Sequence, residues 1–156
     1  MKIQKATTIN HIILTEITKK SKAFWGYSEE QIKKWESNLT VSKEYILKNE
    51  VFNLIDDDEI VGYYSWIKNE DNSVKLDNLF VLPEYIGKGF GKLLMNDFLE
   101  KMKHQKIDRI TLDAEPNAEK FYQKLGFTKI GEFETSIKNR FMPIMEMKLQ
   151  YQIHFF

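Results

Sequence analysis

The sequence predicts an α/β domain with an α+β mixed sheet, in which a central β-sheet is flanked by helices. Two observations support this fold class. Helical periodicity dominates the chain up to Lys48 and returns twice later, while short β-branched and aromatic runs between turn residues fill much of the rest. Such an order predicts helices packed on a sheet. No repeat or proline-rich linker interrupts the 156 residues, so we expect a single domain over residues 1–156.

The N-terminal third is expected to be mainly helical. Residues 2–6, "KIQKA", are a candidate short strand. Isoleucines then recur at helical spacing between residues 8 and 20, at Ile9, Ile12, Ile13 and Ile17. Ser28 followed by Gln31 indicates the capped start of a second helix, with Ile32 and Trp35 beginning its apolar face. Residues 42–48 are expected to add a helical turn or two.

The middle of the chain changes to strand patterns. "VFNLI" (51–55) and "EIVGYYSWI" (59–67) are separated by the turn-forming "DDDE", which predicts a hairpin. "VKLDNLFVL" (74–82) follows another turn and is a third strand. After the glycines at 87–91, one apolar helical face is formed by Leu94, Met95, Phe98, Leu99 and Met102.

The C-terminal third predicts a strand, a helix and two closing strands. "RITLDA" (109–114) is the strand, and "NAEKFYQKLGF" (117–127) is a short helix that ends at Gly126. "FTKIGEFE" (127–134) and "MPIMEMKLQ" (142–150) alternate like two neighbouring strands.

Composition excludes several classes of function. Lysine plus arginine equals aspartate plus glutamate at 23 each, which argues against a general nucleic-acid binder. The absence of cysteine excludes disulfides, thiolate metal sites and a cysteine acyl-enzyme. The three histidines are scattered, so we expect no metal site. The apolar runs are too short for a signal peptide or a membrane span, so we expect a cytoplasmic protein with no membrane partner.

The stretch "FVLPEYIGKGFGKLL" (80–94) places three of the seven glycines within five positions between a strand and a helix. Free N–H groups at such a turn form an anion site, for which phosphate is the usual ligand. A nucleotide P-loop is excluded, because Lys92 is followed by Leu93 instead of a hydroxyl residue. The G-x-G-x-G spacing also departs from the G-x-G-x-x-G of dinucleotide-binding folds. A turn without a ligand and a pyrophosphate loop for coenzyme A remain.

Together with "PNAEKFYQKLGF" (116–127), this stretch resembles the acetyl-coenzyme A motifs of the GCN5-related N-acetyltransferase (GNAT) superfamily. The family motif [QR]-x-x-G-x-[GA] aligns with residues 86–91, where Ile86 replaces the usual glutamine or arginine. The resemblance covers the order of elements from end to end. It implies a GNAT-like acyl-CoA N-acyltransferase fold, with acetyl-CoA as cosubstrate and no metal.

The resemblance also implies which residues bind coenzyme A. The strand before the loop would splay open and offer backbone N–H groups to the thioester, and the loop would hold the pyrophosphate. Lys88 and Lys92 would add positive charge, although solvated lysines are common on any surface. The expected cofactor-binding residues are Leu79, Phe80, Val81, Ile86, Gly87, Lys88, Gly89, Phe90, Gly91, Lys92, Asn117 and Tyr122.

Tyr122 is the candidate general acid. Its phenol, with an ordinary pKa of about 10, can donate a proton to a departing thiolate whose pKa is about 8.5. A core role for Tyr122 is the alternative, but the neighbouring Phe121 is expected to be the core member of the pair.

The general base has two candidates, Asp77 and Glu115. Asp77 shares a strand face with Leu79 and Val81 by period-two alternation, and a charge in an apolar strand is uncommon unless it is paired or functional. Glu115 stands where many members of the family carry asparagine. Asn117 lies two residues on and is expected to contact the pantetheine arm, although it could instead be a helix N-cap.

The acceptor is expected to be a primary amine of a small molecule or peptide. By the resemblance, the first two helices and their connection "KAFWGYSEE" (22–30) line its site. Trp25 and Tyr27, with Tyr64 on the hairpin, would form an aromatic pocket suited to a partly apolar amine, whereas Trp66 is expected in the core. The tail "YQIHFF" (151–156) is consistent with a homodimer. The alternative functions are a non-catalytic acyl-CoA-binding sensor or regulatory domain and, less well supported, a nucleotide-binding domain.

Overall fold

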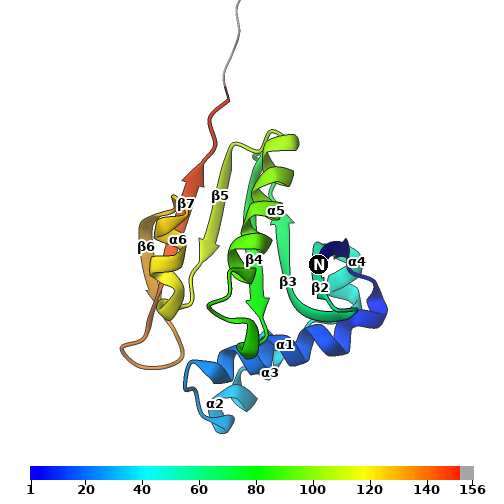
Figure 1. Ribbon diagram of the computed structural model, residues 1–156. Coiled ribbons are helices and arrows are strands. Elements are labelled where there is room, and N and C mark those ends of the chain that lie inside the picture. The colour runs from blue at the N-terminus through cyan, green and yellow to red at the C-terminus, as the bar shows by residue number, and fades with distance from the viewer. Residues whose placement is uncertain (152–156) are drawn as a thin grey trace, which may run out of the picture. The chain divides into compact units, whose positions relative to one another are not determined.

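A computed structural model describes residues 1–151 of the chain (Figure 1). The chain forms two compact units. Unit 1 comprises Met1–Trp66 and Asn78–Glu100, and unit 2 comprises Ile67–Asp77 and the chain from Lys101 onward. The predicted homodimer contact of the tail falls on residues 152–156, apart from Tyr151, and these lie outside the described part of the chain.

The helices and strands occupy most of both units. In chain order the strands are β1 (Lys2–Lys5), β2 (Glu50–Asp56), β3 (Glu59–Lys68), β4 (Ser73–Val81), β5 (Arg109–Asp113), β6 (Thr128–Glu134) and β7 (Phe141–Lys148). The α-helices are α1 (His11–Phe24), α2 (Glu29–Lys34), α3 (Glu36–Leu39), α4 (Lys43–Lys48), α5 (Phe90–His104) and α6 (Glu119–Lys124). Three 3₁₀ turns complete the order: η1 (Thr8–Asn10), η2 (Pro83–Tyr85) and η3 (Pro116–Ala118).

The strands form a sheet in the order β1-β2-β3-β4-β5-β7-β6. The β4–β5 pair is parallel, whereas β1–β2, β2–β3, β5–β7 and β6–β7 are antiparallel. The sheet is therefore mixed, and the predicted fold class is confirmed.

In unit 1, only part of the apolar face that the isoleucines predicted for α1 is buried: Ile17 is fully buried and Ile13 packs against the core. Ile9 lies in η1 and Ile12 in the first turn of α1, with exposed fractions of 84% and 63%. The buried residues of α1 are Leu14, Ile17, Thr18 and Ser21, of which only Ile17 belongs to the predicted set. Two hydroxyl groups therefore enter the core of unit 1 from this helix, and both need hydrogen-bond partners there.

The helical region from residue 28 to residue 48 is broken more often than the sequence predicted. Ser28 caps α2 by accepting a hydrogen bond from the Gln31 N–H at 3.1 Å, as expected. The helix then stops at Trp35, and α3 and α4 follow as separate short helices. Ser42 caps α4 by accepting from the Tyr45 N–H at 3.0 Å.

The predicted apolar face of α5 is confirmed within unit 1, where Leu94, Met95 and Phe98 are fully buried. The predicted β2–β3 hairpin is also confirmed, and its turn uses Asp57 and Asp58 with positive φ. A second apolar cluster in unit 1 joins α1, α4, β2 and β3 through Leu14, Ile17, Ile46, Val51 and Tyr63.

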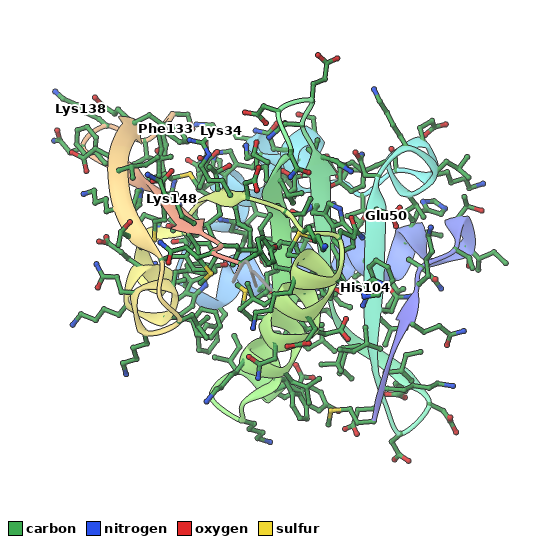
Figure 2. All side chains as sticks on the ribbon, turned by 90° about the horizontal axis from the view of Figure 1, so that it is seen from above. Lys34, Glu50, His104, Phe133, Lys138 and Lys148 are labelled. Atoms are coloured by element: carbon green, nitrogen blue, oxygen red, sulfur yellow. The ribbon has the colours of Figure 1, made fainter. Side chains whose placement is uncertain are left out.

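In unit 2, the two closing strands form an antiparallel hairpin. Figure 2 labels Phe133 and Lys138 at this hairpin, and both side chains are exposed. Gly126 has a φ of +105° and follows α6, where the Phe127 N–H donates to the Tyr122 carbonyl at 3.1 Å. The predicted end of this helix is therefore confirmed.

Among the described residues there is neither a membrane-spanning helix nor a cluster of metal ligands. Within residues 1–151, none of the helices has the length and apolar content needed to cross a bilayer. The same part of the chain holds no group of three histidine, cysteine, aspartate or glutamate side chains placed to bind a metal ion.

Candidate functional site

The glycine loop of unit 1 connects η2 to the start of α5. Gly87 and Gly89 have φ values of +81° and +85°, which glycine adopts at little cost and other residues rarely adopt. A Cβ atom at either position would meet no heavy atom within 4 Å. The loop surface is therefore open, and its backbone can be approached by a ligand.

The start of α5 presents three N–H groups beside this loop. The first helical hydrogen bond runs from the Leu93 N–H to the Gly89 carbonyl at 3.0 Å, so Phe90, Gly91 and Lys92 precede it. The first N–H groups of a helix have no intrahelical partner, and the helix dipole adds positive potential there. The open loop and these donors fit a pyrophosphate group.

Aromatic contacts hold the two ends of the loop. The rings of Tyr85 and Phe90 stack with their centroids 5.0 Å apart. The Lys88 ammonium lies 5.9 Å from the centroid of the Tyr85 ring. Lys88 and Lys92 are both exposed, and Ile86 is half-buried. The loop therefore carries two lysines at its surface.

The end of β4 precedes this loop and orients further N–H groups. The Leu82 N–H donates to the Val61 carbonyl of β3 at 2.8 Å. Successive N–H groups of a strand point to opposite edges, so those of Val81 and Leu79 point away from β3. Phe80 packs instead on the apolar cluster, with its ring 5.9 Å from that of Tyr63.

The ladder between β4 and β5 is short. Its register runs from Ser73 opposite Arg109 to Lys75 opposite Thr111 in unit 2, and both strands continue beyond it. Lys75 also forms an ion pair with Asp113 at 3.0 Å. Asp77, the candidate base, is half-buried on β4.

Tyr122 of unit 2 lies on α6 with an exposed fraction of 8%. Its ring contacts those of Phe121 and Phe127 at centroid distances of 5.2 and 5.9 Å. Burial raises the pKa of the Tyr122 phenol, and the charge of Glu115 raises it further. Phe121 is only half-buried, so the expectation that it is the core member of the pair was wrong.

The Tyr122 hydroxyl forms no hydrogen bond with any of residues 1–151. Within these residues, Asn53 Oδ1 is the one fully buried side-chain oxygen or nitrogen that lacks a hydrogen-bond partner, so the Tyr122 oxygen is not fully buried. The hydroxyl therefore keeps some accessible surface. A protonated, accessible phenol can donate a proton to a reacting group.

Glu115 accepts hydrogen bonds on both carboxylate oxygens. Arg140 donates from Nη2 to Oε2 at 2.8 Å, and Asn117 donates from Nδ2 to Oε1 at 2.9 Å. In this ion pair, the Arg140 side chain is only 12% exposed and the Glu115 side chain only 11% exposed. The side chain of Asn117 does not cap α6, whose N-cap is Ala118, so the N-cap alternative is not observed. The sequence offers no local signal for Arg140 as a partner of Glu115, because the two residues lie far apart along the chain.

The aromatic residues predicted for the acceptor separate into two groups within unit 1. Trp25 is 38% exposed at the end of α1, and Tyr27 packs edge-on against Trp35 at 5.0 Å. Tyr64 is fully buried and donates to Asp97 Oδ2 at 2.6 Å. Its burial argues against contact with an acceptor. Trp66 is 3% exposed and stacks on Phe52, so the expected core role is confirmed.

A polar cluster near the end of β4 was also missed. Asn78 donates from Nδ2 to Ser65 Oγ at 3.0 Å, and the Tyr45 hydroxyl lies 2.8 Å from the same oxygen. Ser65 is fully buried. An asparagine inside a strand, directly before Leu79, was the available sequence signal.

Comparisons with known proteins agree with the architecture. The family model described as an acetyltransferase (GNAT) domain matches residues 25–150. A solved structure described as a PaiA N-acetyltransferase from Thermoplasma acidophilum in complex with coenzyme A is 25% identical, with a TM-score of 0.79. That similarity covers 95% of this chain and 98% of the other.

Two curated relatives match over shorter segments. The [ribosomal protein bS18]-alanine N-acetyltransferase of Haemophilus influenzae is 32% identical over 49% of this chain and 53% of its own length. The uncharacterized N-acetyltransferase ycf52 of Porphyra purpurea is 31% identical over 45% of this chain and 40% of its own length. The chain thus spans about half the length of the curated relatives that it matches. From the family match, the chain belongs to the GNAT acetyltransferase family.

Proposed function

We propose that this protein is an acetyl-CoA-dependent N-acetyltransferase that moves the acetyl group directly to a primary amine in a ternary complex. The observation that carries the proposal is the open glycine loop at the start of α5, with Gly87 and Gly89 at positive φ and three N–H groups beside it. Direct transfer is supported by the absence of cysteine, which removes a cysteine acyl-enzyme.

Coenzyme A would lie along unit 1 from the loop to the end of β4. The pyrophosphate would accept hydrogen bonds from the N–H groups of Phe90, Gly91 and Lys92, with the Lys88 and Lys92 side chains contributing charge. The N–H groups of Leu79 and Val81, which point away from β3, would polarise the thioester carbonyl. Removing one such donor typically costs about 2.7–4 kcal/mol of transition-state stabilisation.

Two proton transfers accompany the reaction. The amine nitrogen forms a bond to the carbonyl carbon, the carbon–sulfur bond breaks, and Tyr122 gives its proton to the departing thiolate. The attacking amine loses a proton to Asp77 or through water. Glu115 is the other candidate base, and both of its oxygens accept hydrogen bonds, from Arg140 and Asn117.

For the acceptor, we propose a primary amine of a small molecule or peptide with an apolar group beside the nitrogen. The exposed ring of Trp25 and the neighbouring Tyr27 support an aromatic acceptor surface on unit 1. A relative that acts on a ribosomal protein alanine makes a peptide N-terminus a reasonable first probe.

Calorimetric titration with coenzyme A and acetyl-CoA tests the proposal, with ATP and NAD as comparison ligands. We expect both coenzyme A and acetyl-CoA to bind. At a ligand concentration of a hundred times Kd, either should raise the free energy of unfolding by about 2.7 kcal/mol. Equal binding of ATP or NAD, or no binding of coenzyme A, would contradict it.

A pair of glycine variants localises the site. Gly89→Ala strains the left-handed backbone by about 1–2 kcal/mol, and we expect coenzyme A affinity to fall about tenfold. Gly26→Ala is the matched control, because Gly26 has a φ of +91° and equally open surroundings. It should lower stability by a similar amount and leave the affinity unchanged.

A further inference from the structure

The last peptide group of β4 is fixed on both sides in unit 1. The Ser21 hydroxyl of α1 donates to the Val81 carbonyl at 2.5 Å, and the Leu82 N–H of the same peptide donates to Val61 at 2.8 Å. Figure 1 shows α1 passing beneath the carboxyl end of β4. The orientation of this peptide is therefore set by α1 and β3 together.

Close packing against β3 adds a third constraint. A Cβ atom on Gly62 would lie 2.8 Å from the Phe80 carbonyl oxygen and 2.9 Å from Val81 Cγ1. Real Cβ atoms essentially never approach other atoms so closely, so only glycine lets β3 and the end of β4 come together in this way.

Ser21 uses its hydroxyl differently from the other buried hydroxyl of α1. Thr18 donates back to the Leu14 carbonyl of its own helix at 2.7 Å and also contacts the Tyr63 hydroxyl. Ser21 is 4% exposed, and its hydroxyl reaches out of the helix to Val81. A buried hydroxyl that bonds another element instead of its own helix fixes that element.

The bonded carbonyl lies on the edge of β4 that matters for the proposed reaction. In a strand, the N–H and C=O groups of one residue point to the same edge, so the Val81 carbonyl and its N–H both point away from β3. Without the Ser21 hydrogen bond, the Val81 carbonyl oxygen would place partial negative charge near the thioester carbonyl oxygen. The Val81 N–H is proposed to stabilise that thioester oxygen. The Ser21 hydroxyl offsets that charge.

We propose that Ser21 is a positioning residue for acetyl transfer, which orients the Val81 N–H toward the thioester carbonyl and covers the neighbouring Val81 oxygen. The inference rests on the proposed function. Ser21 itself contacts neither substrate, and Gly62 provides the close packing that keeps Val81 within its reach.

Steady-state kinetics test this role with acetyl-CoA and two acceptor probes, an alanine-terminated hexapeptide and phenethylamine. The released thiol is measured with a disulfide reagent, and the protein adds no background because it has no cysteine. We expect Ser21→Ala to lower kcat about tenfold or more with KM for acetyl-CoA unchanged, because small displacements of aligned groups are costly. Ser21→Thr keeps the hydroxyl and should recover most of kcat.

Thr18→Ala is the matched control, because it removes a buried hydroxyl from the same helix without touching β4. It should lower Tm by a few degrees, as Ser21→Ala does, and leave kcat within about twofold of the wild type. A kcat loss in Thr18→Ala as large as in Ser21→Ala would overturn the proposal.

A measurement without turnover separates this inference from the proposed function. In ¹⁵N-labelled protein, the Val81 amide should shift when acetyl-CoA replaces coenzyme A, and the shift should shrink in Ser21→Ala. An unchanged shift and kcat in that variant would overturn the role of Ser21 alone. No shift at the glycine loop with coenzyme A in the wild type would overturn both proposals.

Discussion

Two buried tyrosines, one in each unit, show how the same side chain can serve the core or remain available for chemistry. Tyr64 of unit 1 donates its hydroxyl to Asp97 at 2.6 Å and stacks on Phe52. Tyr122 of unit 2 has a packed ring, but its hydroxyl has no hydrogen-bond partner within residues 1–151. In both cases burial is the largest cause that raises the pKa of the phenol.

The difference lies in the hydroxyl group and not in the ring. A buried polar group needs a partner, and a phenol bound to a carboxylate is held in one orientation. A phenol with a buried ring and an unpaired oxygen that keeps some accessible surface can instead bind a ligand. The two tyrosines should therefore respond in opposite ways when each hydroxyl is removed.

The largest expected effect is on turnover by Tyr122→Phe. Loss of the general acid should lower kcat by about 10²–10⁴-fold, with Kd for coenzyme A nearly unchanged. The Tm should change little, because the hydroxyl makes no hydrogen bond among the described residues. Thiol-release kinetics, calorimetric titration and thermal unfolding measure the three quantities.

This variant also separates a catalyst from a sensor. If the wild type acetylates an amine and Tyr122→Phe does not, the protein is a catalyst. If the wild type binds acetyl-CoA but acetylates no amine, the regulatory alternative is supported. Full activity of the variant would remove Tyr122 from the chemistry and leave it as a core residue.

A smaller effect, on stability, is expected from Tyr64→Phe. The change removes the donor from the half-buried Asp97 carboxylate, which should cost about 1–3 kcal/mol in the free energy of unfolding. Urea denaturation measures this loss. Adding Asp97→Asn should recover part of it, because a neutral amide depends less on the Tyr64 donor than a carboxylate does. A loss of kcat in Tyr64→Phe as large as that in Tyr122→Phe would contradict the assigned difference between the two tyrosines.

The sequence was sufficient for the strands, for most of the helices and for the turn at the glycine loop. Strand and helix periods are local, and the φ values that a tight turn imposes favour glycine at 87 and 89. The cap at Ser28 and the helix end at Gly126 were likewise predictable from neighbours in the chain. Local patterns therefore defined the fold class and one part of the site.

Partners distant along the chain were not predictable in the same way. The burial of Tyr64 and the ion pair of Glu115 with Arg140 depend on which segments meet after folding. Periodicity also misplaced Ile9 and Ile12, since an apolar side chain can remain exposed without a large penalty. The Ser21 hydroxyl bond to Val81 belongs to the same category, because serine has many uses on a helix.

The smallest effect is on the pH dependence of stability, where the two tyrosines should behave alike. Because their folded-state pKa values are raised, both phenols stay protonated in the folded state when the unfolded chain loses protons near pH 10. The unfolded state then binds fewer protons, so this contribution is constant below about pH 10 and stability falls as the pH rises above it. At pH 11 each tyrosine should account for about 1.4 kcal/mol of the loss.

Urea denaturation at pH 8 and pH 11 measures this loss. The free energy of unfolding should decline less between the two pH values in Tyr64→Phe and in Tyr122→Phe than in the wild type. Comparing variants cancels the contribution of the lysines, which titrate in the same range. If the decline is unchanged in Tyr122→Phe alone, the Tyr122 phenol of the wild type titrates at its ordinary pKa. Solvent access to its oxygen would then have a larger effect on that pKa than burial of its ring.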